Sequence, residues 1–298
     1  MKRSTSCELS QIWAECSSEF SFSKLQNRQK AETVMHESIP SGFTELDRIT
    51  GGWQPGDLVI IASRPSMGKT AFAISMARNM AVDCGYGVAL FSLEISAHQL
   101  LKRMIYSETE LDASKIRTGK LEPYEQELFD DKVGKLTEAS IFIDDTPALS
   151  TIEFREQCSK LVYKHNIRIA FIDYLQLMGD TRGNREQEVS NIMRSLKAIA
   201  RELNITIIAL SQLNRSISRG GIQGKRPQLA EVDAIEQDAD IVVFIHRPEY
   251  YGFTEDEEGN SLEGIAEIIV AKNRNGALGN VQLTFDKNFA KFSEKSIK

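Results

Sequence analysis

The residues with the clearest chemical meaning lie in one short stretch, Ile60 to Phe72, which reads IIASRPSMGKTAF. Gly68, Lys69 and Thr70 match the G-K-[ST] that closes a phosphate-binding loop, although Ser63 stands where that pattern begins with glycine. Such a lysine holds the β- and γ-phosphates of a nucleotide, and the threonine hydroxyl ligates Mg²⁺. The stretch therefore predicts a nucleotide site, provided that a strand precedes it and a helix follows it.

The flanking sequence has the pattern that such a loop requires. LVIIA before it is typical of a buried strand, and TAFAISMARNMAV after it has helical composition. A small serine fits the entry of the turn, whereas Gly68 lets the backbone approach a phosphate closely. The residues predicted to bind nucleotide are Ser63, Arg64, Pro65, Ser66, Met67, Gly68, Lys69, Thr70 and Ala71.

A metal-bound triphosphate also needs a carboxylate at the end of a neighbouring strand. SIFIDD ends in Asp144 and Asp145, IRIAFID ends in Asp173, and periodicity does not choose between them. Glu94, after GVALFSL, suits a general base that orients the attacking water. Gln212, after ITIIALS, suits a hydrogen bond to the γ-phosphate. The alternatives are an ordinary surface acid and an ordinary strand cap.

Short apolar runs alternate with helical patterns along the chain. Near-continuous runs of this kind fit strands that are buried on both faces, and the clearest helical stripe lies within 184–203. This alternation predicts an α/β fold with a doubly wound, mostly parallel sheet flanked by helices, whose ligands bind at the carboxyl ends of the strands. The predicted strands are LVIIA, GVALFSL, SIFID, IRIAFID, ITIIALS, IVVFI and AEIIVA.

Composition limits the class of protein. The chain has 298 residues, of which 41% are hydrophobic and 26% charged, as in an ordinary globular protein. Its net charge of −6 removes a simple electrostatic argument for nucleic acid without excluding a local basic stripe. The scattered cysteines and histidines show no metal-ligand spacing and fit a reducing cytoplasm. No secretory signal or membrane span is apparent, so we expect a cytoplasmic protein.

Several motifs occur together in a recognisable order. They resemble the motifs of the C-terminal motor domain of the DnaB-type hexameric replicative DNA helicases, over roughly residues 39–292. The resemblance implies a RecA-like P-loop NTPase fold with ATP and Mg²⁺ as cofactors. In that family the position before R-P-S-M-G-K-T is variable, which accommodates Ser63. The motifs are IPSGFTELDRITGGWQPGDLVIIASRPSMGKTAFA, FSLEIS, FIDYLQLM, ALSQLNRS, IEQDADIVVFIHR and AKNRNGALG.

The resemblance also implies a role for each matching residue. It implies that Lys69 binds the phosphates, that Thr70 and Asp173 ligate Mg²⁺, and that Glu94 is the catalytic base. Gln212 matches the residue that links the γ-phosphate to the DNA-binding loops.

A second pair of charged residues matches the family near the end of the chain. Lys272 and Arg274 match the pair that reaches into a neighbouring subunit's nucleotide site. AEIIVAKNR has the pattern of a strand, so both side chains are expected on one side of it, where they suit charge stabilisation in trans. The alternative is two solvated charges. The resemblance therefore implies a homohexameric ring.

The domain organisation departs from the family at the start of the chain. We predict an N-terminal tail or short linker helix over 1–38, the motor domain over 39–293 and a C-terminal tail over 294–298. The family carries a helical N-terminal domain and a linker helix ahead of the motor. If the 38 residues in that place cannot serve as the linker helix, we expect weaker ring formation, and we expect no primase recruitment through that domain.

The segment that contacts DNA departs as well. The family has a sequence like S-D-L-R-E-S-G where this chain has AEVDA, 230–234. A basic, glycine-rich loop remains as a track for single-stranded DNA, although solvated loop charges are the usual alternative. The DNA-binding candidates are Arg215, Arg219, Lys225 and Arg226.

Together these features predict an ATP-dependent replicative DNA helicase motor that hydrolyses ATP at subunit interfaces, translocates on single-stranded DNA and unwinds duplex. Its predicted partners are single-stranded DNA, further copies of itself, and a helicase loader or other replication proteins. The alternative is a RecA-like ATPase without processive unwinding, in a regulatory, assembly or recombination role, or a truncated helicase relative. The intact catalytic set favours the motor, and the AEVDA segment favours the alternative.

Overall fold

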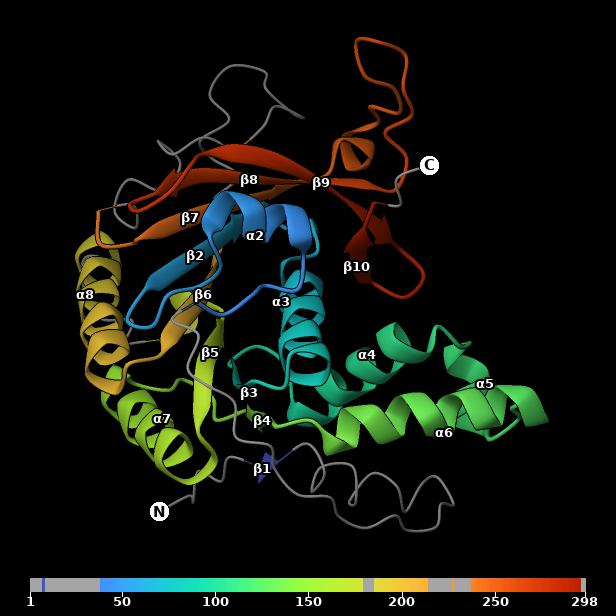
Figure 1. The fold of residues 1–298 in the computed structure, drawn as a ribbon, viewed down its shortest axis with the longest axis horizontal. Helices are drawn as coiled ribbons and strands as arrows, with labels where there is room; N and C mark the ends of the chain where they lie inside the picture. The colour runs from blue at the N-terminus through green and yellow to red at the C-terminus, as the bar shows by residue number, and fades with distance from the viewer. Residues whose placement is uncertain (1–6, 9–37, 179–184, 214–226, 228–236, 296–298) are drawn as a thin grey trace.

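The protein was analysed as a computed structural model, which describes residues 7–8, 38–178, 185–213, 227 and 237–295. These residues form one sheet of ten strands in the order β1-β4-β3-β5-β6-β2-β7-β8-β9-β10 (Figure 1). The six strands from β4 to β7 in that order are parallel, and the others pair antiparallel. The strands are β1 (Cys7–Glu8), β2 (Leu58–Ser63), β3 (Gly87–Ser92), β4 (Ile141–Asp144), β5 (Ile167–Asp173), β6 (Thr206–Gln212), β7 (Ile241–His246), β8 (Ile265–Asn273), β9 (Gly279–Asp286) and β10 (Lys291–Glu294).

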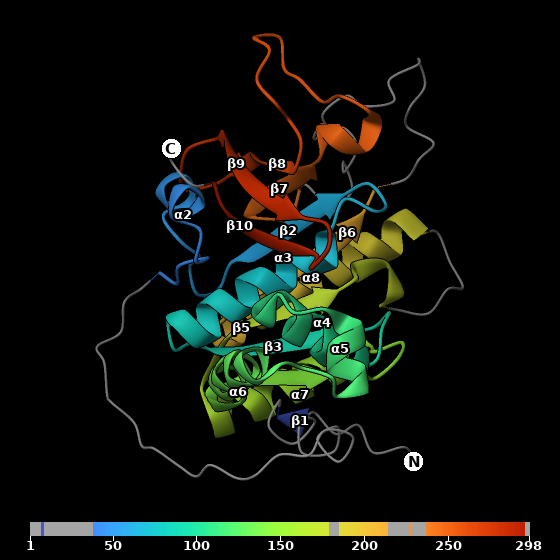
Figure 2. The ribbon, with the colours of Figure 1, turned by 90° about the vertical axis from the view of Figure 1, so that its right-hand side faces the viewer.

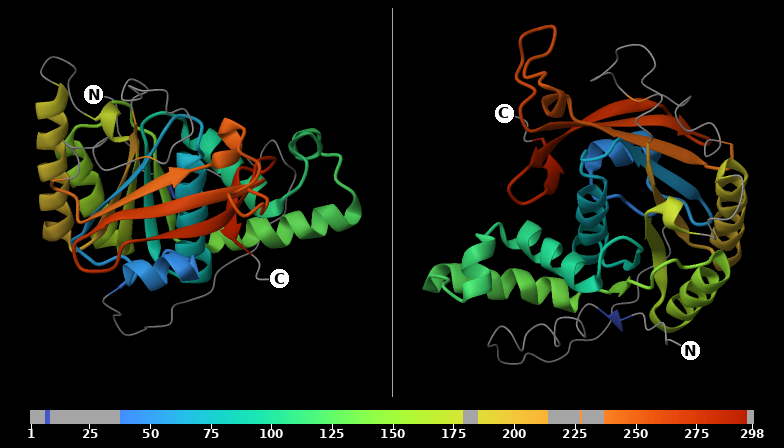
Figure 3. Two further views of the ribbon diagram at one scale, coloured as in Figure 1. Left: turned by 90° about the horizontal axis from the view of Figure 1, so that it is seen from above. Right: turned by 180° about the vertical axis from the view of Figure 1, so that it is seen from behind.

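Helices cover both faces of the sheet, which confirms the predicted doubly wound α/β architecture. The helix α3 lies on one face with α4 and α6, and α7 and α8 lie on the other (Figures 1 and 2). A view from behind shows α4, α5 and α6 extending away from the sheet (Figure 3). The helices are α2 (Thr44–Thr50), α3 (Lys69–Arg78), α4 (Ala97–Thr109), α5 (Ala113–Thr118), α6 (Pro123–Glu138), α7 (Thr151–His165) and α8 (Arg185–Leu203).

The alternation of side chains along each strand divides the core in two. In β2, Val59 and Ile61 point to the core under α3, whereas Leu58 and Ile60 point to the core under α8. Because both faces are covered, the strand is a continuous apolar run, and all six of its residues are buried. The predicted stripe on α8 is buried against the second core.

All seven predicted strands are present, and β1, β9 and β10 are additional. The two C-terminal strands form a hairpin against α3, where the Phe292 backbone N–H donates to Ser75 Oγ at 3.1 Å. The Phe292 ring also meets the Phe72 ring, with centroids 5.2 Å apart. The hairpin thereby brings the end of the described chain to the helix that follows the phosphate loop.

The strand β2 lies at the point where the chain order reverses. Strands β3 to β6 lie to one side of it and β7 to β10 to the other. In open α/β sheets this switch point leaves a crevice at the carboxyl ends of the strands, so the fold places the phosphate loop at its natural ligand position. Among the described residues, no helix combines the length and apolar character that a membrane span requires.

Candidate nucleotide site

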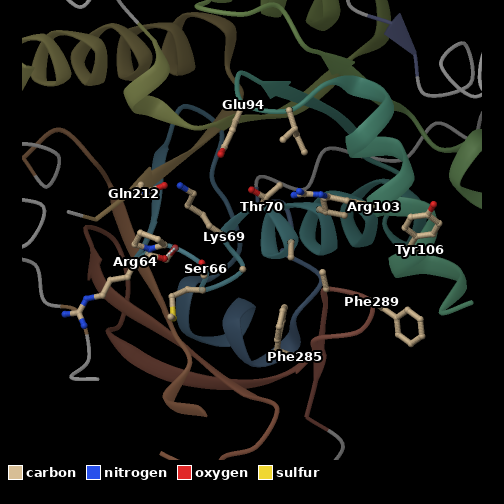
Figure 4. Close-up of a pocket in the computed structure, with 18 of the residues that line it drawn as sticks. Arg64, Ser66, Lys69, Thr70, Glu94, Arg103, Tyr106, Gln212, Phe285 and Phe289 are labelled. Atoms are coloured by element: carbon tan, nitrogen blue, oxygen red, sulfur yellow. Dashed lines mark hydrogen bonds between the residues drawn. The ribbon is translucent and has the colours of Figure 1, made fainter. Parts of the chain in front are cut away.

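A cavity of about 680 Å³ lies at the carboxyl end of β2. All nine residues predicted to bind nucleotide line it, as do Glu94 and Gln212 (Figure 4). Glu94 follows β3 and Gln212 ends β6, so the two side chains approach Lys69 from the carboxyl ends of two strands on the same side of β2. This volume is in the range of small-molecule and cofactor sites in proteins.

The backbone conformation of the phosphate loop explains why its first position, Ser63, needs no glycine. Ser63 is the last residue of β2 and is paired in parallel register with Gln212 on one side and Ile245 on the other. The left-handed backbone conformations of the loop fall later, at Ser66 with φ 67° and at Gly68 with φ 92°. Because an extended strand residue accepts any side chain, serine is compatible with the start of this loop.

Gly68 is required for packing as well as for its backbone angle. A Cβ atom placed there would lie 3.1 Å from the Phe292 ring and 3.3 Å from the Phe285 ring. Both rings belong to the β9–β10 hairpin, which therefore forms a floor beneath the phosphate loop. A side chain at position 68 would displace that floor.

The hydroxyl of Thr70 donates to Asp173 Oδ2 at 2.6 Å, which joins the start of α3 to the end of β5. Asp173 is 7% exposed, and its Oδ1 is buried without a hydrogen-bond partner among the described residues. Burial raises the pKa of Asp173, against the Thr70 hydrogen bond and the positive charges of Lys69 and Arg103. Burial likewise lowers the pKa of Lys69, against the charges of Asp173 and Glu94. Burial therefore works against the charged form of each group.

These observations test whether Mg²⁺ fits. The Thr70 hydroxyl and the Asp173 carboxylate supply oxygen atoms, which are the ligands that Mg²⁺ prefers. A buried carboxylate oxygen with no partner is a group that a cation would satisfy. The residues present therefore fit a magnesium ion that also binds substrate phosphates.

The other two carboxylates left open by the sequence lie elsewhere. Asp144 Oδ1 accepts from the Thr146 backbone N–H at 2.9 Å, and Asp145 Oδ2 accepts from the Ala97 backbone N–H, at the start of α4, at the same distance. Their strand, β4, is separated from β2 by β3, β5 and β6. The strand order thus brings Asp173, and neither of these, to Thr70.

The end of β6 is held by a side chain that the sequence did not single out. The Gln176 amide donates to Ser211 Oγ at 2.9 Å and to the Gln212 carbonyl at 3.1 Å. The Gln212 side chain is exposed and lines the cavity. Gln176 therefore orients the backbone that presents Gln212.

Two walls of the cavity were missed by sequence reasoning. Arg103 and Tyr106 approach from α4, and Phe285 and Phe289 approach from the hairpin (Figure 4). Arg103 lies close enough to Asp173 to act on its charge. The signal for the hairpin was present, because GNVQLTFD alternates apolar and polar residues. Nothing in the helical pattern distinguishes Arg103 from other charged residues of α4.

Lys272 and Arg274 lie outside the lining of this cavity. Lys272 pairs with Val242, and β8 ends at Asn273, one residue before Arg274. The direction of Arg274 is therefore set by its own contacts rather than by strand alternation. Its Nη2 donates to the Gln237 carbonyl at 2.8 Å, and its Nη1 lies 3.4 Å from Asp240 Oδ1.

Arg274 is held at the opposite end of β2 from the phosphate loop. Its backbone N–H donates to the Asp240 carbonyl at 2.9 Å, and the Asp240 N–H donates to the Leu58 carbonyl at the same distance. Leu58 is the first residue of β2 and Ser63 is the last. At about 3.3 Å per residue, the two ends of the strand lie about 16 Å apart. The side chain therefore does not reach the cavity of its own chain.

The DNA-binding candidates Arg215, Arg219, Lys225 and Arg226 lie outside the described residues, as does the AEVDA segment. Most of the predicted N-terminal segment 1–38 also lies outside them.

Comparison with known proteins places this arrangement in a family. The family model described as the DnaB-like helicase C terminal domain matches residues 38–294. The chain is 48% identical to the replicative DNA helicase DnaB of Geobacillus stearothermophilus over 260 residues, covering 85% of this chain and 56% of the relative. It thus spans about half the length of the curated relatives that it matches.

Solved structures agree with this comparison. The ATPase domain of G40P superposes with a TM-score of 0.79 at 37% identity, over 87% of this chain and 92% of that one. A DnaB-like replicative helicase, solved in a study of its interactions with primase, superposes with a TM-score of 0.77 at 37% identity, over 86% of this chain and 61% of that one.

Proposed function

The chain belongs to the DnaB-like helicase C-terminal domain family, and we propose on this premise that it is an ATP-dependent replicative DNA helicase motor. The observation that carries the proposal is the buried pair of Thr70 and Asp173 beside Lys69, with Asp173 Oδ1 left without a partner among the described residues. Burial raises the pKa of Asp173 and lowers the pKa of Lys69. A magnesium-bound triphosphate would give Asp173 Oδ1 a cation to bind and would place phosphate charge beside Lys69.

The residues of the cavity divide the work of hydrolysis among them. Lys69 and the backbone N–H groups at the start of α3 bind the phosphates. Thr70 and Asp173 would hold Mg²⁺, which would supply positive charge to the phosphate oxygens. Glu94 orients the attacking water and accepts its proton, and Gln212 hydrogen-bonds to the γ-phosphate.

The site is completed by a second subunit in this proposal. Arg274 and Lys272 reach the γ-phosphate bound to a neighbouring copy, and a ring of six copies closes the arrangement. The distance of about 16 Å between the two ends of β2 supports action in trans, because Arg274 does not reach its own cavity. An arginine supplied by a neighbour contributes on the order of 10³-fold or more to hydrolysis in related phosphoryl transfers.

Single-stranded DNA is the proposed track for this motor. The support is the basic stretch that contains Arg215, Arg219, Lys225 and Arg226, which follows Gln212 in the sequence. Further copies of the chain, a helicase loader and other replication proteins are the proposed partners, since a DnaB-like relative has been described with primase. We place the protein in the cytoplasm.

One sequence feature favours a second candidate function. AEVDA lacks the arginine and glycine of the corresponding family segment and carries Glu231 and Asp233, which repel phosphate. A RecA-like ATPase that hydrolyses ATP without processive unwinding would tolerate this change.

The test is the ATPase rate against added single-stranded DNA, with the oligomeric state read by light scattering in the same samples. We expect strong stimulation in a species of ring size, and Lys69→Ala provides the inactive control. Hydrolysis that ignores DNA would favour the second candidate. A monomer without hydrolysis would contradict both functions for this chain on its own.

A further inference from the structure

Four charged side chains, Asp57, Lys197, Asp240 and Arg274, meet at the amino ends of β2 and β7 and are called here the amino-end cluster. Lys197, on α8, donates from Nζ to the Gly56 carbonyl at 2.8 Å and to the Asp240 carboxylate. Its Nζ also lies 3.5 Å from Asp57 Oδ1. The cluster contains two acids and two bases and is therefore neutral as a group.

Asp240 is the fixed member of this cluster. It is 4% exposed, and its Oδ2 accepts from the Leu58 backbone N–H at 2.8 Å as well as from Lys197. Its own backbone N–H donates to the Leu58 carbonyl. The carboxylate is thus oriented by the first residue of β2, the strand that leads to the phosphate loop.

Arg274 is the outer member of the cluster, and both its backbone and its guanidinium group have partners. Asp240 accepts its backbone N–H through the carbonyl and faces its guanidinium through Oδ1, and Gln237 accepts from Nη2. The Arg274 side chain is 42% exposed, and an arginine with that exposure otherwise samples many rotamers. One short segment, 237–240, therefore sets the direction in which this arginine points.

We propose that Asp240 is the positioning residue of Arg274 and presents its guanidinium to the nucleotide of a neighbouring copy. The inference rests on the proposed function, in which Arg274 acts in trans. A guanidinium has five N–H donors, and the contacts to Asp240 and Gln237 use two of them, so a phosphate can be bound while Asp240 keeps its hold. Catalytic groups displaced by about 1 Å lose on the order of 10²-fold in rate, so this orientation matters for hydrolysis.

The proposal is tested by mixing subunits with different defects. Lys69→Ala removes the nucleotide site but keeps Arg274, and Asp240→Asn keeps the nucleotide site but releases Arg274. We expect Asp240→Asn alone to lower kcat by about 10- to 100-fold with unchanged binding of a fluorescent ATP analogue. Mixed with Lys69→Ala, it should regain activity, up to about a quarter of the wild-type rate for random mixing and independent sites.

Three controls accompany the mixture. Arg274→Ala mixed with Lys69→Ala reports whether a trans site exists at all. Asp238→Asn removes a charge from the same segment, where Asp238 lies 3.6 Å from the exposed Arg194, and should hydrolyse ATP like wild type. The double variant K197M/D240N also removes the lysine that loses its buried Asp240 partner in Asp240→Asn, so the cluster stays neutral and the cost to the fold is reduced.

The outcomes separate the two levels of inference. Rescue in the mixtures that contain D240N or K197M/D240N supports the proposal, because a purely structural defect would not be repaired by a neighbour. Rescue with Arg274→Ala but with neither Asp240 variant would overturn it while leaving the trans site intact. Failure of the Arg274→Ala mixture would overturn the trans site itself, and the positioning role with it.

Discussion

The two ends of β2 carry charged groups that are buried to a similar extent but paired very differently. Beyond the carboxyl end, Asp173 is 7% exposed and has one carboxylate oxygen without a partner among the described residues. At the amino end, Asp240 is 4% exposed and is bound by the Leu58 N–H and by Lys197, with Arg274 beside it. Burial alone therefore does not identify a ligand site, whereas the unmet hydrogen bond of Asp173, placed beside Thr70 and Lys69 of the phosphate loop, supports one.

The difference follows from the cost of burying a charge. A buried carboxylate is stable when a cation and hydrogen-bond donors meet it, and it remains costly when they do not. In the amino-end cluster, the carboxylate of Asp240 is paired with hydrogen-bond donors and positive charges of the same chain, and the cluster stabilises the fold. Asp173 has one carboxylate oxygen without such a partner among the described residues, and its surroundings are suited to a ligand.

The largest expected effect on hydrolysis comes from the phosphate loop at the carboxyl end of β2. Lys69→Ala should reduce ATP hydrolysis by about 10³-fold or more, since it removes the cation that faces the phosphates. It should not lower the melting temperature of the ligand-free protein, because burial already disfavours the charged lysine there. Steady-state ATPase and a thermal melt measure the two effects, and normal turnover would show that the cavity is not the catalytic site.

A second loss of hydrolysis is expected from the amino end of β2, without any loss of nucleotide binding. Arg274→Ala should reduce hydrolysis by about 10³-fold while an isolated subunit binds nucleotide almost as wild type, because the side chain does not reach its own cavity. Turnover and equilibrium binding of a fluorescent ATP analogue separate the two quantities. A variant with wild-type turnover would refute action in trans.

The same substitution at the two buried aspartates should have opposite consequences for stability. Asp240→Asn should lower the free energy of unfolding by about 3 kcal/mol, since it leaves Lys197 buried beside a neutral group. K197M/D240N should recover most of that loss. Urea unfolding of the two variants gives the comparison, and equal losses would show that the lysine is not the cause.

Asp173→Asn should leave the ligand-free protein as stable as wild type at pH 7, or more so. The pKa of Asp173 is raised from its ordinary 3.8, so ionisation is disfavoured in the folded state. Its contribution to stability is present below pH 3.8 and is lost as pH rises through the raised value. The advantage of the variant should accordingly grow with pH over that window. Melting temperatures from pH 4 to 7 test this, and a second series with Mg²⁺ and ATP should show stabilisation of wild type alone.

The smallest effect is expected from Ser63→Gly, which restores the usual first glycine of the loop. Ser63 is an extended residue of β2 and needs no special backbone freedom. The change should leave hydrolysis within about twofold and cost roughly 0.5–1 kcal/mol of stability, the usual penalty for glycine in a strand. A large gain in activity would show that the serine limits this loop.

The parallel part of the fold was predictable because its strands are buried on both faces. Runs such as LVIIA and IRIAFID are continuous or nearly continuous in apolar residues, and six of the seven predicted runs correspond to the parallel strands. The seventh, AEIIVA, lies in β8, which pairs antiparallel. The strand β9 is half buried and alternates Val281, Leu283 and Phe285 with polar residues, so a search for continuous runs passes over it. The strand β10 has four residues, which is too short for any periodic signal.

The phosphate loop was predictable from local spacing, and Glu94 and Gln212 from their places at strand ends, whereas the choice among the strand-end aspartates came only from the family resemblance. The spacing of Gly68, Lys69 and Thr70 is local, and the sequence carries it directly. The choice of Asp173 over Asp144 depends on the strand order β4-β3-β5-β6-β2, which results from long-range pairing. Arg103 reaches the cavity because of the rotation of α4, a quantity that composition does not contain.

The floor that the β9–β10 hairpin forms under Gly68 has a consequence for the order in which the protein matures. During synthesis, residues 279–294 leave the ribosome after every other wall of the cavity. A nascent chain that has emerged only as far as β8 already displays the phosphate loop, but Phe72 still lacks the ring of Phe292. The hairpin is thus the last wall of the cavity to be added, and a nucleotide that contacts this wall is expected to stabilise the finished domain over the nascent one.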